Sequence, residues 1–327
     1  SNTVNYPSFS QIIEMFFEDP QSEEIQYLKQ QTSNLKRNYY DEVIESINNT
    51  GNIPPYIGRD KEIQKLVETF NRNEKNHIIL VGKPGSGRSS LMKAFQGAVV
   101  RGEFASETHG LVKFPFVFEV DIAGLVDPKT MLDHIQMAEY FGVLTGGRKI
   151  VFIFNDAHLI SPTNLAYLKS HLHKSEQNNS NVHFVLTTNS ANAGKILEDK
   201  GFAKKFLKME LEPFSEEDSI KIVREIVQPR WQRTYKGLEG ITEEALTFAT
   251  KYFKFEQKNA GILGGIVEIL EGAITHHMLE KGKENFELGI DDLRSYLKDN
   301  LNFALIPGDP EFEDKFEVLW NKVEANY

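Results

Sequence analysis

Short apolar runs alternate with helix-length segments through the middle of this chain. Five runs of strand length lie at positions 78–81, 116–122, 150–154, 182–188 and 207–211. Short strands that are apolar on both faces and separated by helices are typical of a parallel sheet with helices on each side. The pattern therefore predicts an α/β domain over residues 53–212 with a five-stranded parallel sheet.

The segments on either side of this region have helical spacing instead. Within residues 1–52 apolar positions recur at steps of three, four and seven, and a polar stretch with two prolines follows. This part is predicted as an N-terminal helical segment with a linker. From Pro213 onward the strand pattern stops, and the spacing predicts a smaller α-helical domain over 213–300. Residues 301–327 are expected to form a tail with a short helix.

Composition and charge restrict the class of protein. The 327 residues are 40% hydrophobic, and 37 Lys and Arg stand against 47 Asp and Glu, for a formal net charge of −10. This composition is globular, and the acidic balance disfavours nucleic acid as a partner. The chain has no Cys, which excludes disulfides and thiol catalysis. Because neither a signal peptide nor an apolar run of the ~18–20 residues that span a membrane is visible, we expect a cytoplasmic, soluble protein without a membrane partner.

A glycine-rich loop follows the first predicted strand directly. Its sequence is Gly82-Lys83-Pro84-Gly85-Ser86-Gly87-Arg88-Ser89-Ser90, a Walker A pattern with Arg88 in the place of lysine. Between a strand and a helix, such glycines let backbone N–H groups surround a polyphosphate. We therefore expect ATP or ADP as cofactor, bound by Gly82, Pro84, Gly85, Ser86, Gly87, Arg88, Ser89 and Ser90, with Mg²⁺ on Ser89. The alternative is a glycine-rich turn that binds nothing.

Further motifs occur in an order that resembles the first ATPase module of the Clp family of AAA+ unfoldases. They are Ile57-Gly58-Arg59-Asp60-Lys61-Glu62-Ile63, Val100-Arg101-Gly102-Glu103, Asn155-Asp156-Ala157-His158 and the stretches 121–126, 186–188, 199–206 and 212–218. The resemblance implies a P-loop AAA+ domain with a helical lid and nucleotide between them. It also implies protein partners and a homo- or hetero-oligomeric ring, and it places the adenine beside Tyr56 and Ile57.

The chain departs from this family at the residues that do the chemistry. Asn155-Asp156 stands where the family has Asp-Glu. A neutral amide thus replaces the acid that holds the Mg²⁺ water shell, and a shorter carboxylate replaces the general base. A displacement of ~1 Å at such a base costs about 10²-fold in rate. Arg88 replaces the lysine that reaches the β- and γ-phosphates, and its planar fork does not match the geometry of a point charge.

Other departures concern contacts between subunits and with substrate. Lys204 and Lys205 stand where the family has two arginines that act in trans, so bidentate contacts to a neighbour's nucleotide are lost. Without the resemblance this pair is better explained as a solvated face. Thr188, or Asn189 in the general AAA+ pattern, holds the sensor position, with a buried structural threonine as the alternative. Met131 falls where unfoldases of the family present a substrate-gripping aromatic, and is otherwise explained as helix core.

These departures predict a Clp-like nucleotide-binding module with impaired or absent hydrolysis that acts as an assembly or regulatory partner of proteins. Its altered catalytic positions are Asp156, Asn155, Thr188, Lys204 and Lys205. One alternative is a slow but genuine ATPase with Asp156 as base. Another, weakened by the net charge of −10, is a DNA-loading AAA+ module. His276 and His277 are not expected to bind metal, because no carboxylate partner is seen at ligand spacing.

Overall fold

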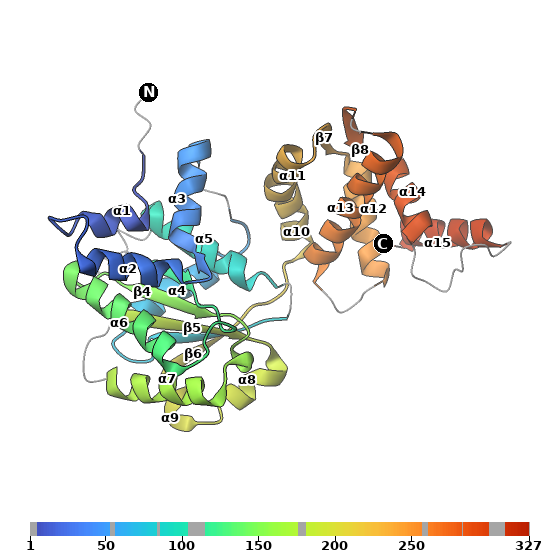
Figure 1. Ribbon diagram of the computed structural model, residues 1–327. Coiled ribbons are helices and arrows are strands. Elements are labelled where there is room, and N and C mark those ends of the chain that lie inside the picture. The colour runs from blue at the N-terminus through green and yellow to red at the C-terminus, as the bar shows by residue number, and fades with distance from the viewer. Residues whose placement is uncertain are drawn as a thin grey trace. The chain divides into compact units, whose positions relative to one another are not determined.

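The computed structural model describes residues 5–52, 56–83, 86–103, 115–175, 181–256, 261–282, 284–300 and 311–326. The chain forms two compact units, Ser1–Glu212 and Pro213–Tyr327, and Figure 1 labels most of their elements. Unit 1 holds the glycine-rich loop and the residues of the predicted catalytic positions. Unit 2 begins where the strand pattern of the sequence stops.

Unit 1 is an α/β domain built on a six-stranded sheet with the order β1-β3-β4-β5-β2-β6. The strands are β1 (Arg37–Asn38), β2 (His77–Val81), β3 (Phe116–Glu119), β4 (Ile150–Phe154), β5 (Val182–Thr188) and β6 (Phe206–Glu210). Every neighbouring pair is parallel except β1 with β3. The predicted five-stranded parallel sheet is confirmed. The antiparallel edge strand β1 was not predicted, because two residues carry no alternation to detect.

Helices cover both faces of this sheet. They are α1 (Phe9–Glu14), α2 (Glu23–Ser33), α3 (Tyr39–Thr50), α4 (Asp60–Phe70), α5 (Arg88–Val100), α6 (Pro128–Leu144), α7 (Pro162–Ser175), α8 (Ser190–Ile196) and α9 (Lys200–Ala203). Side chains alternate across a strand, so Ile79 belongs to one buried cluster and Ile78 to another. The first cluster takes in residues of α1, α2 and α6, and the second takes in residues of α4 and α5.

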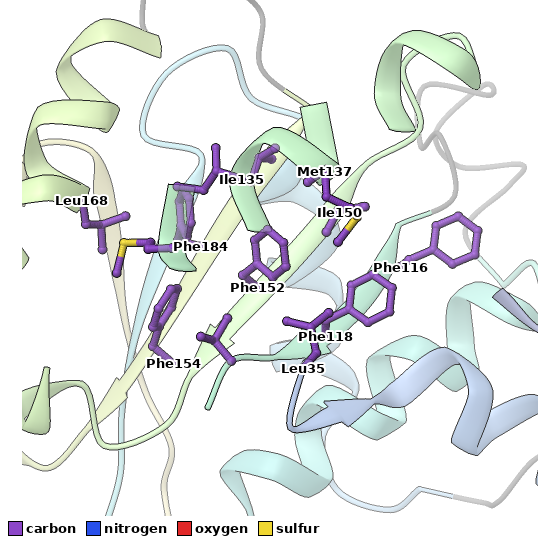
Figure 2. Packing of buried hydrophobic residues seen from close by; sticks show 14 of the residues in the cluster. Leu35, Phe116, Phe118, Ile135, Met137, Ile150, Phe152, Phe154, Leu168 and Phe184 are labelled. Carbon is purple, nitrogen blue, oxygen red and sulfur yellow. The ribbon is translucent and has the colours of Figure 1, made fainter. Parts of the chain in front are cut away.

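Aromatic side chains dominate the first cluster. The rings of Phe118 and Phe184 lie on either side of Phe152, with centroids 6.4 and 6.3 Å from it, across strands β3, β4 and β5 (Figure 2). Phe9 of α1 is fully buried, and its ring lies 4.9 Å from that of Phe118. The N-terminal helices therefore pack on the same sheet that carries the loop, and they belong to the same compact unit.

Unit 2 is mostly helical. It consists of α10 (Glu216–Ile222), a π-helical turn (Val223–Val227), α11 (Gln228–Thr234), β7 (Leu238–Ile241), α12 (Glu243–Glu256), α13 (Ile262–Lys281), β8 (Phe286–Leu288), α14 (Ile290–Asn300) and α15 (Phe312–Asn326). The expectation that strands stop at Pro213 is wrong, because β7 and β8 form a parallel pair. These strands are too short to show a period in the sequence, and only their pairing defines them.

Helix α13 is long and apolar enough to cross a membrane by length and composition, which the sequence analysis did not anticipate. Its residues Ile266, Leu270 and Ile274 are fully buried, and the helix packs against α12 and α14 of the same unit. The core helix of a globular domain meets the same criteria, so this property is weak evidence for a membrane span. We interpret α13 as the central helix of unit 2.

Candidate functional site

Two glycines of the loop after β2 fit its geometry closely. A side chain at Gly82 would place its Cβ 2.4 Å from Ser86 Oγ, so any other residue there forces the Ser86 hydroxyl out of its present position. Gly87 has φ +84°, in the left-handed region that glycine adopts freely, and it precedes the first residue of α5. Pro84 and Gly85 lie outside the described residues. The described part of the loop thus has the strand-to-helix turn that the sequence predicts.

Arg59 fixes the backbone of this loop from outside. Its side chain is almost fully buried and donates from Nη2 to Ser86 O at 2.9 Å and from Nη1 to Glu212 O at 3.0 Å. Glu62 lies 3.6 Å from the same guanidinium. One side chain therefore ties the loop to the last residue of unit 1. Sequence reasoning placed Arg59 in a motif without giving it a role.

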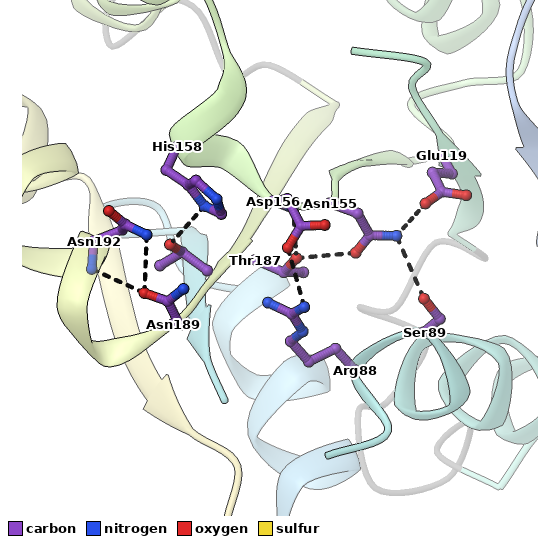
Figure 3. Close-up of polar contacts among 10 residues, drawn as sticks. Arg88, Ser89, Glu119, Asn155, Asp156, His158, Thr187, Asn189 and Asn192 are labelled. Atoms are coloured by element: carbon purple, nitrogen blue, oxygen red, sulfur yellow. Dashed lines mark hydrogen bonds and ion pairs between the residues drawn. The ribbon is translucent and has the colours of Figure 1, made fainter. Parts of the chain in front are cut away.

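The cation at the start of α5 is paired with the carboxylate that follows β4. Arg88 Nη2 donates to Asp156 Oδ1 at 3.1 Å (Figure 3). Asp156 has φ +55°, and its N–H donates to Thr187 Oγ1 at 3.1 Å. The left-handed turn at Asp156 and the hydrogen bond that its N–H donates to Thr187 hold the carboxylate toward Arg88. The two charged groups therefore interact with each other.

Asn155 connects three elements around the start of α5. Its Oδ1 accepts a hydrogen bond from Thr187 Oγ1 at 3.0 Å, and its Nδ2 lies 3.4 Å from Ser89 Oγ. The same Nδ2 donates to Glu119 Oε1 at the end of β3 (Figure 3). The structure thus brings Arg88, Ser89, Asn155 and Asp156 together, as the sequence predicts.

Two members of this cluster were missed by sequence reasoning, namely Glu119 and Thr187. Glu119 is only 3% exposed although it ends an apolar strand. A charged residue within an otherwise apolar run is rarely fully buried unless it has a partner or a function. The position of Glu119 in the apolar run 116–122 could therefore have marked it as a candidate from the sequence alone. Thr187 could not be separated from Thr188 without knowing which face of β5 each side chain occupies.

A tyrosine hydroxyl completes the surroundings of Glu119. Tyr39, the first residue of α3, is fully buried, and its hydroxyl has no hydrogen-bond partner among the residues that the structure describes. Burial first, and the negative charge of Glu119 next, raise the pKa of Tyr39 to about 12. The phenol is therefore protonated at neutral pH and can act as a donor beside Glu119 and Ser89.

The predicted sensor residues lie apart from this cluster. Thr188 Oγ1 is buried and lies 3.4 Å from His158 Nδ1. Asn189 caps helix α8, and its Oδ1 accepts from the N–H of Asn192 at 3.0 Å. Because side chains alternate along β5, Thr187 instead of Thr188 contacts Asn155.

The predicted trans-acting lysines lie at the end of the strands that is opposite to the loop. The carbonyl of Lys205 accepts from the N–H of His77, which begins β2, whereas the loop follows the other end of that strand. Lys205 is 7% exposed, and Lys204 is exposed to solvent. Neither residue meets the loop of its own chain, so a role at a nucleotide requires a neighbouring subunit.

Tyr56, which is expected near the adenine, contacts residues that follow helix α5 instead of residues of the loop. Tyr56 donates to Glu103 Oε2 at 3.0 Å, and the Arg101 guanidinium lies 5.1 Å from the ring centre. These partners follow the C-terminal end of α5, whereas the loop precedes its N-terminus. Ile57 is half-buried and Ser90 is exposed. Tyr56 is thus not brought to the Arg88 cluster.

Two other expectations of the sequence analysis are decided by packing. Met131 is 1% exposed within α6, so it belongs to the core and cannot grip a substrate. The expectation that the adjacent histidines lack carboxylate partners is wrong. His276 Nε2 lies 3.0 Å from Asp299 Oδ2, and His277 Nδ1 lies 2.6 Å from Asp292 Oδ1. Helix α14 carries both carboxylates, so only the packing of α13 on α14 forms these pairs.

Comparison with known proteins identifies the fold of unit 1. Residues 78–199 match the model of the AAA family, described as the ATPase family associated with various cellular activities. The chain contains an AAA ATPase domain. This AAA domain resembles those of Clp and Hsp104 proteins, as the order of its motifs predicts.

Curated relatives match part of this AAA chain. The Clp protease ATP-binding subunit ClpE of Bacillus subtilis is 25% identical over 130 residues, which are 38% of this chain and 18% of that protein. The chaperone ClpB of Lactococcus lactis is 25% identical over 190 residues, which are 54% of this chain and 20% of that protein. The chain therefore spans about a fifth of the length of these relatives.

Solved structures of similar fold include Hsp104. Hsp104 with ATPγS and FITC-casein has a TM-score of 0.65 and 17% identity, covering 90% of this chain and 52% of that chain. The ADP complex of Saccharomyces cerevisiae Hsp104 has a TM-score of 0.63 and 18% identity, covering 90% and 54%. At this identity the likeness supports the fold alone.

Proposed function

We propose that this chain is a Clp-like AAA+ module that binds ATP or ADP with impaired or absent hydrolysis and acts as an assembly or regulatory partner of proteins. The ion pair between Arg88 and Asp156 carries the proposal. The motif order assigns Arg88 to the γ-phosphate and Asp156 to the attacking water. A charge-assisted hydrogen bond between them satisfies both groups. Arg88 is drawn away from the phosphate, and Asp156 is engaged by a cation instead of by water.

The loop supports nucleotide binding in spite of this pair. The space above Gly82 that a Cβ would fill holds Ser86 Oγ, which is buried without a hydrogen-bond partner among the described residues. Gly87 opens α5, whose N-terminus favours a phosphate. The AAA family in general binds ATP with Mg²⁺, and the hydroxyl of Ser89 offers the oxygen ligand that this ion prefers. These residues would hold the phosphates and the metal ion.

A slow but genuine ATPase remains a second candidate, because one observation favours it. The Asp156 side chain is 47% exposed, so water reaches the carboxylate despite its ion pair. A DNA-loading module is disfavoured by the net charge of −10.

Further parts of the proposal rest on the resemblance to Clp proteins. Assembly into a homo- or hetero-oligomeric ring, in which exposed Lys204 rather than buried Lys205 faces a neighbour's nucleotide, is one of them. Contact of the base with Tyr56 and Ile57 is another, and Ile57→Asp is then expected to weaken binding. A cytoplasmic location and protein partners complete the proposal; the related Hsp104 structure contains casein.

Calorimetry and a phosphate-release assay on the same preparation test the central claim. We expect ADP and ATPγS to bind and turnover to stay below about 0.01 s⁻¹, since losing one transition-state contact costs ~10²–10³-fold. As a control, Gly82→Val should abolish binding by displacing Ser86. Turnover above about 0.01 s⁻¹ but well below about 1 s⁻¹ would establish the second candidate. Turnover near about 1 s⁻¹ would show a competent ATPase and refute impaired hydrolysis, and a lack of nucleotide binding would refute both candidates.

A further inference from the structure

The carboxylate of Glu119 is buried beside the expected metal position without a direct ionic partner. Among the described residues its one side-chain hydrogen bond comes from Asn155 Nδ2, a neutral amide. Arg37 contributes positive charge nearby, but its guanidinium is paired with Glu42 at 2.9 Å. A buried carboxylate that lacks a paired charge is costly. A bound divalent cation would supply the missing charge.

Strand pairing places Glu119 next to the position where the family has its metal-holding acid. Glu119 lies opposite Ile153 in the parallel register of β3 and β4, and Asn155 follows two positions later. The Asn155 amide stands between the Glu119 carboxylate and Ser89 Oγ. The carboxylate is thus displaced by one strand, and a single amide nitrogen links it to that hydroxyl.

A half-turn of the Asn155 amide would make this cluster an oxygen site. The rotation brings Oδ1 toward Glu119 and Ser89 and turns Nδ2 toward Thr187. Thr187 Oγ1 has two lone pairs, so it can accept from Nδ2 as well as from the N–H of Asp156. Three oxygens from a carboxylate, an amide and a hydroxyl then converge, which suits Mg²⁺.

Tyr39 is a second and independent observation at this position. Its side chain is fully buried, and its hydroxyl is unpartnered among the described residues and lies near Glu119 and Ser89. A buried hydroxyl without a hydrogen-bond partner is expensive. A water molecule on a metal ion between these residues would donate to the phenol oxygen.

We propose that Glu119 is the carboxylate that anchors Mg²⁺ in this site, together with oxygens of Ser89 and Asn155. This inference rests on the proposed nucleotide binding and extends it. The charge that the family places at the position of Asn155 is supplied here by the neighbouring strand. Glu119 therefore keeps Mg²⁺-nucleotide binding intact although Asn155 is neutral.

The test measures metal binding rather than turnover. ADP affinity is determined by calorimetry with MgCl₂ and with EDTA, and bound Mn²⁺ is followed by electron paramagnetic resonance in the presence of ADP. In Glu119→Gln we expect the Mn²⁺ affinity of the ADP complex to fall ~10–100-fold or more. ADP affinity in EDTA should change little, since the loop is untouched. Glu45→Gln, on the exposed side of α3, is the charge-matched control.

A double variant separates metal anchoring from a structural role. Asn155→Asp combined with Glu119→Gln keeps the amide–carboxylate hydrogen bond with the partners exchanged, so it should fold even if Glu119→Gln alone does not. We expect it to regain Mn²⁺ binding. A double variant that folds without regaining it, or a Glu119→Gln protein that binds Mn²⁺-ADP like the unmodified chain, would overturn the inference and leave the proposed function standing. If the unmodified chain bound ADP neither with MgCl₂ nor with EDTA, the proposed function itself would be overturned.

Discussion

Arg88 Nη2 and Asp156 Oδ1 lie 3.1 Å apart although the residues are 68 positions apart in the chain. Strand β5 lies between β4 and β2 in the sheet. Asp156 follows β4 and Arg88 follows the loop after β2, so both side chains meet across the end of β5. The pair thus joins the cationic and anionic positions of the proposed nucleotide site.

Reversal of the three substitutions should restore hydrolysis. With Arg88→Lys, Asn155→Asp and Asp156→Glu together, we expect turnover to rise about 10²-fold or more, because a base of full length then faces water instead of arginine. Phosphate release from ATP measures the effect.

The same triple variant with Lys204→Arg and Lys205→Arg tests the trans-acting positions. Arg88→Lys alone serves as control and should give a much smaller gain, since Asn155 stays neutral. The substituted residues act together on one reaction, so their effects on turnover are not additive. Unchanged turnover in the variant with all five substitutions would contradict the assignment of this site.

Removal of the Arg59 side chain should destabilise unit 1. Arg59→Ala leaves the carbonyls of Ser86 and Glu212 without donors and Glu62 without its partner. We expect a loss of about 2–4 kcal/mol in the free energy of unfolding, measured by urea denaturation. Arg72→Ala, at an exposed position, should change it by less than about 0.5 kcal/mol. Equal stability of the two variants would rule out this role.

Adjacent glycines in α13 should respond to alanine with opposite signs. A Cβ at Gly265 would lie 1.8 Å from Phe253 Cδ2, so Gly265→Ala forces the buried ring to move. Such overpacking costs about 1–3 kcal/mol. At Gly264 a Cβ meets nothing within 4 Å, and Gly264→Ala should stabilise the helix by up to about 1 kcal/mol. Thermal unfolding of unit 2 in the intact chain distinguishes them, and equal shifts would contradict the packing.

Stability should fall as the pH is lowered below 6.5. Burial first, then Lys205 and His171, lower the pKa of His77 from 6.5 to about 3. Burial, then Lys149 and His77, lower the pKa of His183. At a pH between 6.5, the pKa of these histidines in the unfolded chain, and their lowered pKa in the folded protein, the unfolded chain binds more protons than the folded one. The stabilisation is therefore full above pH 6.5 and is lost progressively as the pH falls toward 3.

For one such histidine the expected loss between pH 7 and pH 5 is about 2 kcal/mol. Urea denaturation at both pH values measures it. His183→Gln removes one titrating group and should reduce the pH dependence by roughly half. Stability that is independent of pH over this interval would show that these histidines are charged, or accessible, in the folded protein.

The sequence was most informative where the signal is local. Four of the five parallel strands are buried along their whole length, β6 alternates between apolar and charged residues after its first residue, and the loop after β2 carries its own glycine pattern, so the α/β fold and the loop were predicted. The strands β1, β7 and β8 were not predicted. They span only two to four residues, and only hydrogen bonds to a distant partner make them strands.

The sequence by itself thus determined the sheet, the glycine-rich loop and the residue types around it. Tertiary structure alone decided that Arg88 meets Asp156, that Thr187 rather than Thr188 contacts Asn155, and that Glu119 reaches Asn155 from the next strand. The physical reason is that the hydrophobic pattern from which strands and helices are predicted depends only on neighbours along the chain. A polar contact at the end of a parallel sheet depends on strand order and on the alternation of side chains between its two faces.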